Sequence, residues 1–408
     1  MHNLIELERK YCADNYAPLP FVLTRGDGVY VWDTEGRQYM DMMSAYSAVS
    51  HGHVHPRLIK ALREQAEQLT VVSRAFHTDK LGAFLKKACL LTSMDKALPM
   101  NSGAEAVETA LKAARKWAYK IKGVEKDKAK IIVCEGNFHG RTISIISFSS
   151  EPQYRDGFGP LTPGFKMIPY DDTAALEASI TANTAAFLVE PIQGEGGIIV
   201  PETGYLSRCA EICKDNNVLL LCDEIQTGLG RTGRMLASDH EHVKPDGIML
   251  GKALGGGLLP VSLFLARENL MDVFQPGDHG STFGGNPLAA AVGLEALNTI
   301  VDEHLEERAE TMGDYFIRKL REIKSPLIKK IRGKGLLIGV EIDTRQVSGA
   351  HACAVLAEHG ILTKDTHENV IRFSPPLIIN GFQIDWAVEQ IEKSLGKLET
   401  QDWKKAAG

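Results

Sequence analysis

The sequence predicts an α/β fold, in which a large domain with a mostly parallel central sheet is joined to a small α+β domain. After Asn101, short apolar runs typical of buried strands alternate with helical stretches, which indicates a parallel sheet with helices on both faces. After Pro287, further helical and strand patterns predict a second, smaller domain. We expect an N-terminal segment (1–45) that is part of the small domain, a large domain (46–287) and a C-terminal small domain (288–408).

The first hundred residues predict three elements. Residues 1–20 read as a short helix followed by an irregular segment that contains Pro18 and Pro20. Residues 21–43 alternate and turn like a small antiparallel meander. Leu58, Leu62, Ala66 and Leu69 recur at helical spacing, which predicts a helix over 56–69.

The residues from about 104 to 250 are predicted to form the central sheet of the large domain and a helix that packs on it. An alanine-rich helix is expected over 104–120, and its apolar residues lie on one face. Because parallel sheets bind ligands at the carboxyl ends of their strands, polar residues at these ends are candidate site residues. The predicted strands cover residues 131–134, 185–190, 218–222 and 247–250.

The last third predicts the small domain. A long helical segment is expected from 288 to about 324. A strand pair is expected to begin within 331–341, and the tail 404–408 should fray. The remaining predicted elements are a helix at 349–359, a strand at 370–373 and a helix at 382–397.

Bulk composition narrows the class of protein. The chain has 408 residues with 44% hydrophobic and 24% charged, as in ordinary globular proteins. The net charge of −6 does not indicate the basic surface that a nucleic-acid-binding protein needs. No apolar run is long enough to span a membrane, and the N-terminus lacks the apolar core of a signal peptide. Seven scattered cysteines without a CxxC motif indicate reduced thiols. A cytoplasmic protein is expected.

Lys252 and Asp223 are the most informative residues. Lys252 stands where an apolar strand meets a glycine-rich turn, and Asp223 ends another apolar run. A desolvated lysine has a lowered pKa and becomes a usable amine nucleophile. An aspartate that faces the same site can hold a protonated ring nitrogen. A lysine for a Schiff base and a partner for a pyridinium are what a pyridoxal phosphate enzyme needs.

Two glycine-rich segments are candidates for binding a phosphate. Ser102 can cap the helix that begins near Gly103, where free N–H groups and the helix dipole favour an anion. Thr282 lies in Gly280-Ser-Thr-Phe-Gly-Gly-Asn-Pro287 and offers a hydroxyl. Each segment has a plainer interpretation, as a capped helix start and as an ordinary loop.

Other side chains are candidates for ring and carboxylate contacts. Phe138 could stack on a flat ring, and Arg141 could bind a carboxylate with its planar fork, although a core phenylalanine and a surface arginine would look the same. Arg372 has apolar neighbours and needs a partner if it is buried. The alternate histidines from His51 to His55 have no supporting carboxylate or cysteine spacing, so no metal site is predicted.

Taken in order, these segments resemble the class III aminotransferases, which have fold type I of the pyridoxal phosphate enzymes (the aspartate aminotransferase fold). The resemblance covers nearly the whole chain, and within the family it is greatest to the enzymes that act on ornithine. The blocks that carry it are Ser44-Ala-Tyr-Ser-Ala-Val49, Asn101-Ser-Gly-Ala-Glu-Ala106, Asn137-Phe-His-Gly-Arg-Thr142, Glu190-Pro-Ile-Gln-Gly-Glu195, Asp223-Glu-Ile-Gln-Thr-Gly228, Gly251-Lys-Ala-Leu-Gly-Gly256 and Gly280-Ser-Thr-Phe-Gly-Gly-Asn-Pro287.

The resemblance implies a role for each cofactor-binding residue. Lys252 would carry pyridoxal 5'-phosphate covalently and later move a proton, and Asp223 would pair with the ring nitrogen. Gln226 would bind the ring hydroxyl, while Phe138 would stack on the ring. The phosphate would be held by Ser102, Gly103 and Ala104, together with Thr282 of a neighbouring subunit, so a homodimer is implied.

The resemblance also implies how substrates are chosen. Residues matching Tyr16 and Tyr46 surround the α-amino acid end of L-ornithine, and Arg141 binds its carboxylate. Glu195 pairs with Arg372 while ornithine is bound, and the pair opens for 2-oxoglutarate. His139 replaces a tryptophan of the animal ornithine enzymes and is expected to lie behind the stacking residue.

Three alternatives stay open at this point. One is an aminotransferase of the same family that acts on acetylornithine or 4-aminobutyrate. Another is an isomerase of the same fold, which would not need 2-oxoglutarate. The third is a non-catalytic regulator that binds the cofactor, although the chain has no basic segment for DNA.

Overall fold

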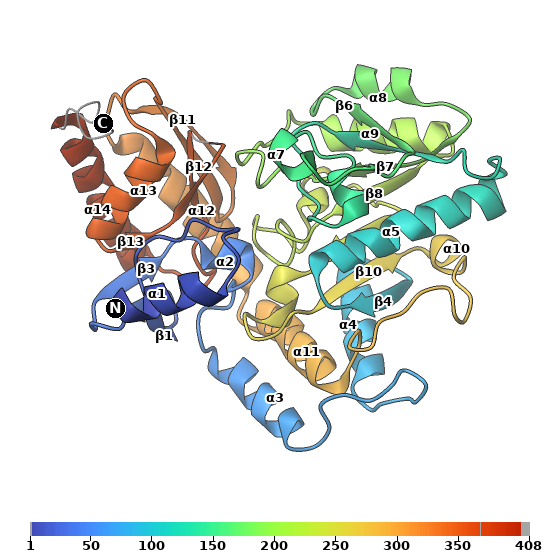
Figure 1. Ribbon diagram of the computed structural model, residues 1–408, viewed down its shortest axis with the longest axis horizontal. Helices are drawn as coiled ribbons and strands as arrows, with labels where there is room; N and C mark the ends of the chain where they lie inside the picture. The colour runs from blue at the N-terminus through green and yellow to red at the C-terminus, as the bar shows by residue number, and fades with distance from the viewer. Residues whose placement is uncertain (1, 368, 401–408) are drawn as a thin grey trace.

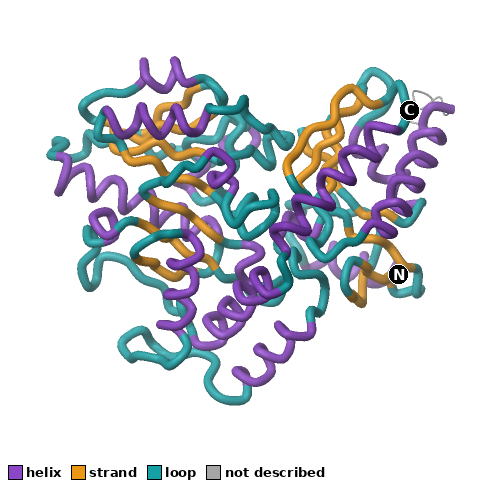
Figure 2. The backbone as a smooth tube through the Cα atoms, turned by 180° about the vertical axis from the view of Figure 1, so that it is seen from behind, coloured by secondary structure: helices purple, strands orange, loops and turns teal. Residues whose placement is uncertain are grey.

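The computed structural model describes residues 2–367 and 369–400, so the predicted fraying of 404–408 lies outside the described residues. Figure 1 shows two lobes, a large one built on a wide sheet and a small one that gathers both ends of the chain. The same two lobes appear from behind in Figure 2, with the strands of the large lobe enclosed by helices. The expectation of an α/β chain with a large and a small unit is confirmed.

The large lobe contains a seven-stranded sheet in the order β4-β10-β9-β8-β7-β5-β6. Strands β6, β5, β7, β8 and β9 pair in parallel, whereas β10 is antiparallel to both of its neighbours, so the sheet is mostly parallel. Strands β4, β6 and β10 were not predicted. In sheet order, the strands are Lys96–Met100, Ser262–Ala266, Gly247–Leu250, Leu219–Asp223, Thr184–Val189, Lys130–Cys134 and Phe165–Ile168.

Helices cover both faces of this sheet, as predicted. On one face, α5 (Gly103–Trp117) packs its alanines against alternate strand residues such as Ala186 and Leu188. On the other face, α8 (Thr173–Ser179) and α9 (Tyr205–Asp215) pack against Phe187 and Val189. Side chains alternate along a strand, so every strand residue here is buried by one helix layer or the other.

The remaining helices of the large lobe are mostly short. The helix predicted over 56–69 is α3, and it ends at Ala66. The π-helical turn Ala118–Lys122 continues α5 where the sequence predicted helix up to 120. The others are α4 (Leu81–Thr92), α6 (Ile143–Ile146), α7 (Pro152–Arg155), α10 (Glu268–Met271) and α11 (Pro287–Asp302), with α3 at Pro56–Ala66 and 3-10 turns at Ala237–Glu241 and Lys252–Gly255.

The small lobe contains two four-stranded sheets. The predicted meander forms β1-β2-β3, and β13 from the C-terminal part pairs in parallel with β3. The second sheet has the order β11-β12-β15-β14. The strands are β1 (Leu23–Asp27), β2 (Tyr30–Asp33), β3 (Gln38–Asp41), β11 (Ile328–Lys334), β12 (Leu337–Ile342), β13 (Ile361–Leu362), β14 (Lys364–Thr366) and β15 (Val370–Phe373); the helices are α1 (His2–Tyr11), α2 (Ser44–Ser47), α12 (Leu305–Glu322), α13 (Gly349–Glu358) and α14 (Gly381–Thr400).

The long helical segment predicted from 288 to about 324 consists of two helices in the structure. Helix α11 ends at Asp302, and α12 begins at Leu305. His304 between them has a φ of 51°, a left-handed conformation that breaks the helical path. Both segments have helical periodicity, so the sequence pattern alone did not show the break. It allows α11 to pack on α3 and α4 while α12 packs on β11.

Candidate active site

A cavity of about 190 Å³ lies at the carboxyl ends of the central strands. This is the position where open parallel sheets bind ligands. Both predicted chemical residues face it, Asp223 from the end of β8 and Lys252 from the turn after β9. The lining residues are Gly103, Ala104, Phe138, His139, Gly140, Glu190, Glu195, Asp223, Ile225, Gln226, Thr227 and Lys252.

Lys252 has the properties of an activated amine. Burial lowers the pKa of its ammonium group to about 8, although the charges of Glu195 and Asp223 oppose the shift. An amine with this pKa is partly neutral near neutral pH and can act as a nucleophile. The backbone of Lys252 is left-handed, with a φ of 45°. Strained backbone of this kind gathers at functional sites, where the surrounding structure holds it.

Asp223 is held by a residue whose contact the sequence did not reveal. Its Oδ2 lies 2.7 Å from Nδ1 of His139, and its Oδ1 accepts from the backbone N–H of Ile225 at 3.0 Å. His139 is buried, which by itself lowers its pKa, but the hydrogen bond and charge of Asp223 outweigh burial and raise it. The raised pKa favours a proton on His139, which can then donate from Nδ1 to Asp223. His139 was expected only to lie behind Phe138, and no sequence signal connected it to Asp223.

Glu190 adds a second buried carboxylate beside this pair. Its oxygens accept from the backbone N–H groups of Phe138, at 3.0 Å, and Gly194, at 3.3 Å. Burial raises the pKa of Glu190 to about 7, while the charge of His139 lowers it and that of Asp223 raises it. Its hydrogen bonds connect the loop carrying Phe138 to the loop carrying Glu195.

The N-terminus of α5 forms one wall of the cavity. Ser102 caps the helix as predicted, accepting from the N–H of Glu105, whose side chain accepts in return from the Ser102 N–H. Gly103 and Ala104 occupy the first helical positions, where backbone N–H groups have no partner within the helix. A Cβ on Gly103 would come within 3.0 Å of Ile225, so glycine permits the close approach. This wall suits an anion.

Glu195, which lines the cavity, forms an ion pair with the buried Arg372. The guanidinium nitrogens lie 2.6 and 2.9 Å from the two carboxylate oxygens, in a bidentate arrangement. Burial alone would raise the pKa of Glu195, but the charge and hydrogen bonds of Arg372 lower it to about 2. Arg372 is only 1% exposed, so its predicted need for a partner is confirmed. The Tyr46 ring lies 5.1 Å from its guanidinium.

Phe138 and Arg141 occupy the cavity wall and its rim. Phe138 lines the cavity. Arg141 is exposed, and its guanidinium stacks at 4.0 Å from the ring of Tyr154 and 5.9 Å from that of Phe138. Tyr154 was not predicted, and it holds Arg141 at the rim by a cation–π contact.

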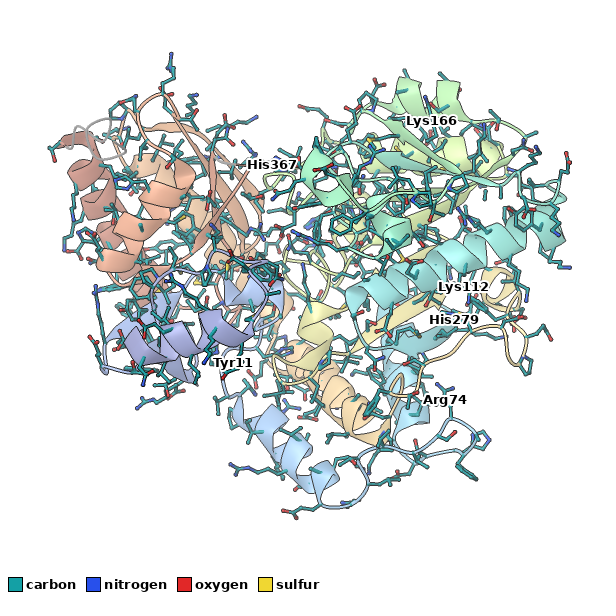
Figure 3. All side chains as sticks on the ribbon, viewed as in Figure 1. Tyr11, Arg74, Lys112, Lys166, His279 and His367 are labelled. Atoms are coloured by element: carbon teal, nitrogen blue, oxygen red, sulfur yellow. The ribbon has the colours of Figure 1, made fainter. Side chains whose placement is uncertain are left out.

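The predicted residues Ser102, Tyr46, Arg141 and Arg372 stand behind or beside the cavity lining, and Tyr16 and Thr282 are exposed and do not line the cavity either. Tyr16 is 74% exposed. Thr282 lines a separate surface hollow together with Ser73 and Arg74. Figure 3 places Arg74 and His279, three residues before Thr282, on the side of the large lobe away from the small lobe. It also places His367, at the β14–β15 turn, on the side of the small lobe that faces the large lobe, the same sheet that carries Arg372.

The cavity fits pyridoxal 5'-phosphate on the residues present. Lys252 supplies an amine for the aldehyde, and Asp223 supplies a carboxylate for the ring nitrogen. The N-terminus of α5 supplies a binding site for the phosphate. The Oε1 atom of Gln226 is buried without a hydrogen-bond partner, as expected of a group that binds a ligand. Its Nε2 donates to Glu195 Oε1 at 3.2 Å, which connects the cofactor end of the cavity to the Glu195–Arg372 pair.

Comparisons with known proteins agree with this geometry. The chain is 57% identical over 390 residues to the ornithine aminotransferase of Geobacillus sp. (strain WCH70), covering 96% of this chain and 97% of that protein. The structure matches the Toxoplasma gondii ornithine aminotransferase with a TM-score of 0.96 at 48% identity, covering 98% and 95% of the two chains. It also matches the acetylornithine aminotransferase of Elizabethkingia anophelis, with a TM-score of 0.88, 51% identity, and 97% and 99% coverage. The family model for aminotransferase class III matches residues 11–395, and the chain belongs to the class III aminotransferases.

Proposed function

We propose that the protein transfers the δ-amino group of L-ornithine to 2-oxoglutarate, with pyridoxal 5'-phosphate as cofactor. The products are L-glutamate 5-semialdehyde, which cyclises with loss of water, and L-glutamate. The observation that carries the proposal is one cavity lined by Lys252, Asp223 and Glu195, in which Glu195 is paired with the buried Arg372. The similarity to ornithine aminotransferases over nearly the full length supports it.

The cofactor end prepares the reaction. When bound, pyridoxal phosphate supplies an aldehyde that joins the amine and a ring that withdraws an electron pair from the neighbouring carbon. Asp223, held in place by His139, would favour a proton on the ring nitrogen and so strengthen that withdrawal. Lys252, whose pKa is lowered to about 8, would take the proton from the substrate carbon that bears the amine and return it to the aldehyde carbon of the cofactor. Phe138 would cover the ring face, Gln226 would bind the ring hydroxyl, and Ser102, Gly103 and Ala104 would hold the phosphate.

The substrate end selects the donor. With Glu195 closed on Arg372, the arginine charge is neutralised, so the ω-amine end of ornithine enters without a carboxylate there. Tyr16, Tyr46 and Arg141 then hold the α-amino acid end of the donor. When 2-oxoglutarate binds, Glu195 swings away, Arg372 takes the α-carboxylate and Arg141 takes the γ-carboxylate.

We also propose a cytoplasmic homodimer in which Thr282 completes the phosphate site of the neighbouring subunit. Thr282 is exposed and lies outside the cavity of its own chain, and the neighbouring Phe283 is 56% exposed, as suits an interface. No helix in the described part of the chain is long and apolar enough to cross a membrane. We keep the division into segments 1–45, 46–287 and 288–408 as part of the same proposal, although α11 (Pro287–Asp302), at the start of the last segment, packs on the large lobe.

A donor panel tests the function. The visible absorbance of the cofactor-loaded enzyme should bleach with ornithine and return on addition of 2-oxoglutarate. The Lys252→Ala variant should lose transamination activity, and a normal rate in this variant would contradict the role proposed for Lys252. Product formation with 2-oxoglutarate omitted would instead indicate an isomerase.

Acetylornithine is the second candidate donor, because the Elizabethkingia acetylornithine enzyme is 51% identical to this chain. Bleaching by N-acetylornithine in preference to ornithine would favour it. A Tyr46→Ile variant separates the two, since ornithine selectivity should fall when the tyrosine is removed.

A further inference from the structure

The segment that carries Tyr46 has an unusual backbone. Four successive non-glycine residues, Ser44 to Ser47, have φ values of 50°, 46°, 60° and 74°. The left-handed region is unfavourable for residues with a Cβ and is normally visited by single residues. A run of four therefore stores strain, and it persists only where the surrounding structure holds it.

Asp41 holds the entry to this left-handed turn. Its Oδ1 accepts from the backbone N–H groups of Met43, at 2.9 Å, and Ser44, at 2.8 Å. Its Oδ2 lies 2.8 Å from Nε2 of His53, which keeps the carboxylate oriented. Asp41 is 9% exposed, so water competes little for these bonds. Removal of this carboxylate leaves two N–H groups at the start of the strained turn, the buried one of Ser44 and the half-buried one of Met43, without their acceptor.

The turn is also joined to the strand that carries Arg372. The Ser44 hydroxyl donates to the Ser374 carbonyl at 2.7 Å, and the Ser374 hydroxyl donates to the Met43 carbonyl at 3.0 Å. The Ser374 N–H donates to the Met42 carbonyl at 2.7 Å. Ser374 stands two residues after Arg372, so these bonds set the distance between the turn and the arginine. The Tyr46 ring is thereby held 5.1 Å from the Arg372 guanidinium.

We propose that Asp41 is a positioning residue for donor selection, because it clamps the left-handed turn that holds Tyr46 beside the Glu195–Arg372 pair. The proposal rests on the proposed function. If the turn relaxes toward ordinary backbone, the Tyr46 side chain leaves the position from which it contacts the donor. Asp41 does not line the cavity and acts through Tyr46.

The first test is a double-mutant cycle on donor selectivity, the ratio of kcat/KM for ornithine to that for N-acetylornithine. Asp41→Ala should lower this ratio about 10-fold, the effect of misplacing one specific contact. In a Tyr46→Ile background the same substitution should change the ratio less than about twofold, because Asp41 then has nothing to position. Asp41→Asn, which keeps an acceptor oxygen, should restore most of the ratio.

Asp33→Ala is the matched control. Asp33 is also buried, and its Oδ1 accepts from the N–H groups of Glu35 and Arg37, both at 2.9 Å, but in a turn that does not carry Tyr46. It should lower stability without altering selectivity. An unchanged ratio in Asp41→Ala, or an equal loss with and without Tyr46, overturns the proposal.

The second test does not depend on the donor or on recovery of Asp41→Ala. Ala45 is exposed and left-handed, so Ala45→Gly relieves strain without removing a contact. The urea midpoint of the apoprotein should hold or rise, whereas it should fall for Ala83→Gly, an exposed alanine in the right-handed helix α4. Ornithine selectivity should drop at the same time, because the turn is looser.

The outcomes separate the two proposals. A wild-type enzyme that does not use ornithine contradicts the proposed function, while the stability comparison of the glycine variants still tests the strained turn. A wild-type enzyme that prefers ornithine, with a selectivity that Ala45→Gly and Asp41→Ala leave unchanged, contradicts the positioning role alone.

Discussion

Replacing Glu195 with glutamine removes the charge that neutralises Arg372 but keeps the size of the side chain. The pKa of Glu195 falls from 4.5 to about 2, because the arginine outweighs the effect of burial. A depressed carboxyl pKa stabilises the protein above the unfolded value of about 4.3, and this stabilisation is lost as the pH falls toward 2. At neutral pH the pair is therefore at full strength. The shift corresponds to about 3 kcal/mol.

That free energy is what a substrate carboxylate must overcome to displace Glu195 from Arg372. In Glu195→Gln the arginine is available at once, so kcat/KM for L-glutamate as donor should rise relative to that for ornithine. Three kcal/mol corresponds to about 100-fold, and the partial exposure of Glu195 reduces the expectation to about 10- to 100-fold. Rapid-mixing measurements of each half-reaction, followed by the cofactor's visible absorbance near pH 8, give the ratio directly.

Glu295→Gln is the matched control for this prediction. Glu295 also accepts from an arginine, Arg57, at 2.6 Å and has a similar exposure of 24%, but it lies on α11 outside the site. The donor ratio should be unchanged there. A ratio in Glu195→Gln that stays within threefold of the wild type would refute the view that Glu195 blocks Arg372 against carboxylates.

Three further predictions concern binding and stability. The His139→Phe variant breaks the buried pair with Asp223 and should weaken cofactor binding by about 3 kcal/mol at pH 7, measured by equilibrium titration; an equal affinity would argue against support of Asp223 by His139. Because the pKa of His139 is raised in the folded protein, the contribution of this pair to folding stability should be present below pH 6.5 and should fade as the pH rises through the folded pKa. Because the pKa of Lys252 is lowered to about 8, its charge reduces the unfolding free energy of the apoprotein by about 3 kcal/mol below pH 8, and this cost vanishes above pH 10.5. The Lys252→Met variant should therefore have a higher urea midpoint than the wild type at pH 7 and the same midpoint at high pH. The Gly313→Ala variant should have an unfolding free energy lower by about 1–3 kcal/mol, because the added Cβ would lie 2.1 Å from the Gly335 carbonyl oxygen. This loss is expected even though alanine favours the helical conformation, and an unchanged thermal midpoint would contradict the packing argument.

Local patterns predicted the strands that surround the site. The strands at 247–250 and 370–373 have the predicted bounds, and β8 differs by one residue at each end from 218–222. Buried strands and amphipathic helices carry their period in their own residues, so they can be identified without a fold. The break at His304 could not, because a left-handed residue between two helical patterns leaves the period on each side intact. Strand β10 runs against its neighbours, a direction set by the path of the chain and not by its residues.

The sequence by itself determined the chemistry that this protein can perform: a lysine and an aspartate at strand ends, glycines where a phosphate can approach, and the order of motifs that defines its family. The tertiary structure decided which of these groups meet. Glu195 reaches Arg372 across 177 residues and His139 reaches Asp223 across 84, and only the packing of sheets and loops brings such distant groups within hydrogen-bond distance. It also decided the left-handed backbone from Ser44 to Ser47, because residues with a Cβ adopt that conformation only when tertiary hydrogen bonds hold them there.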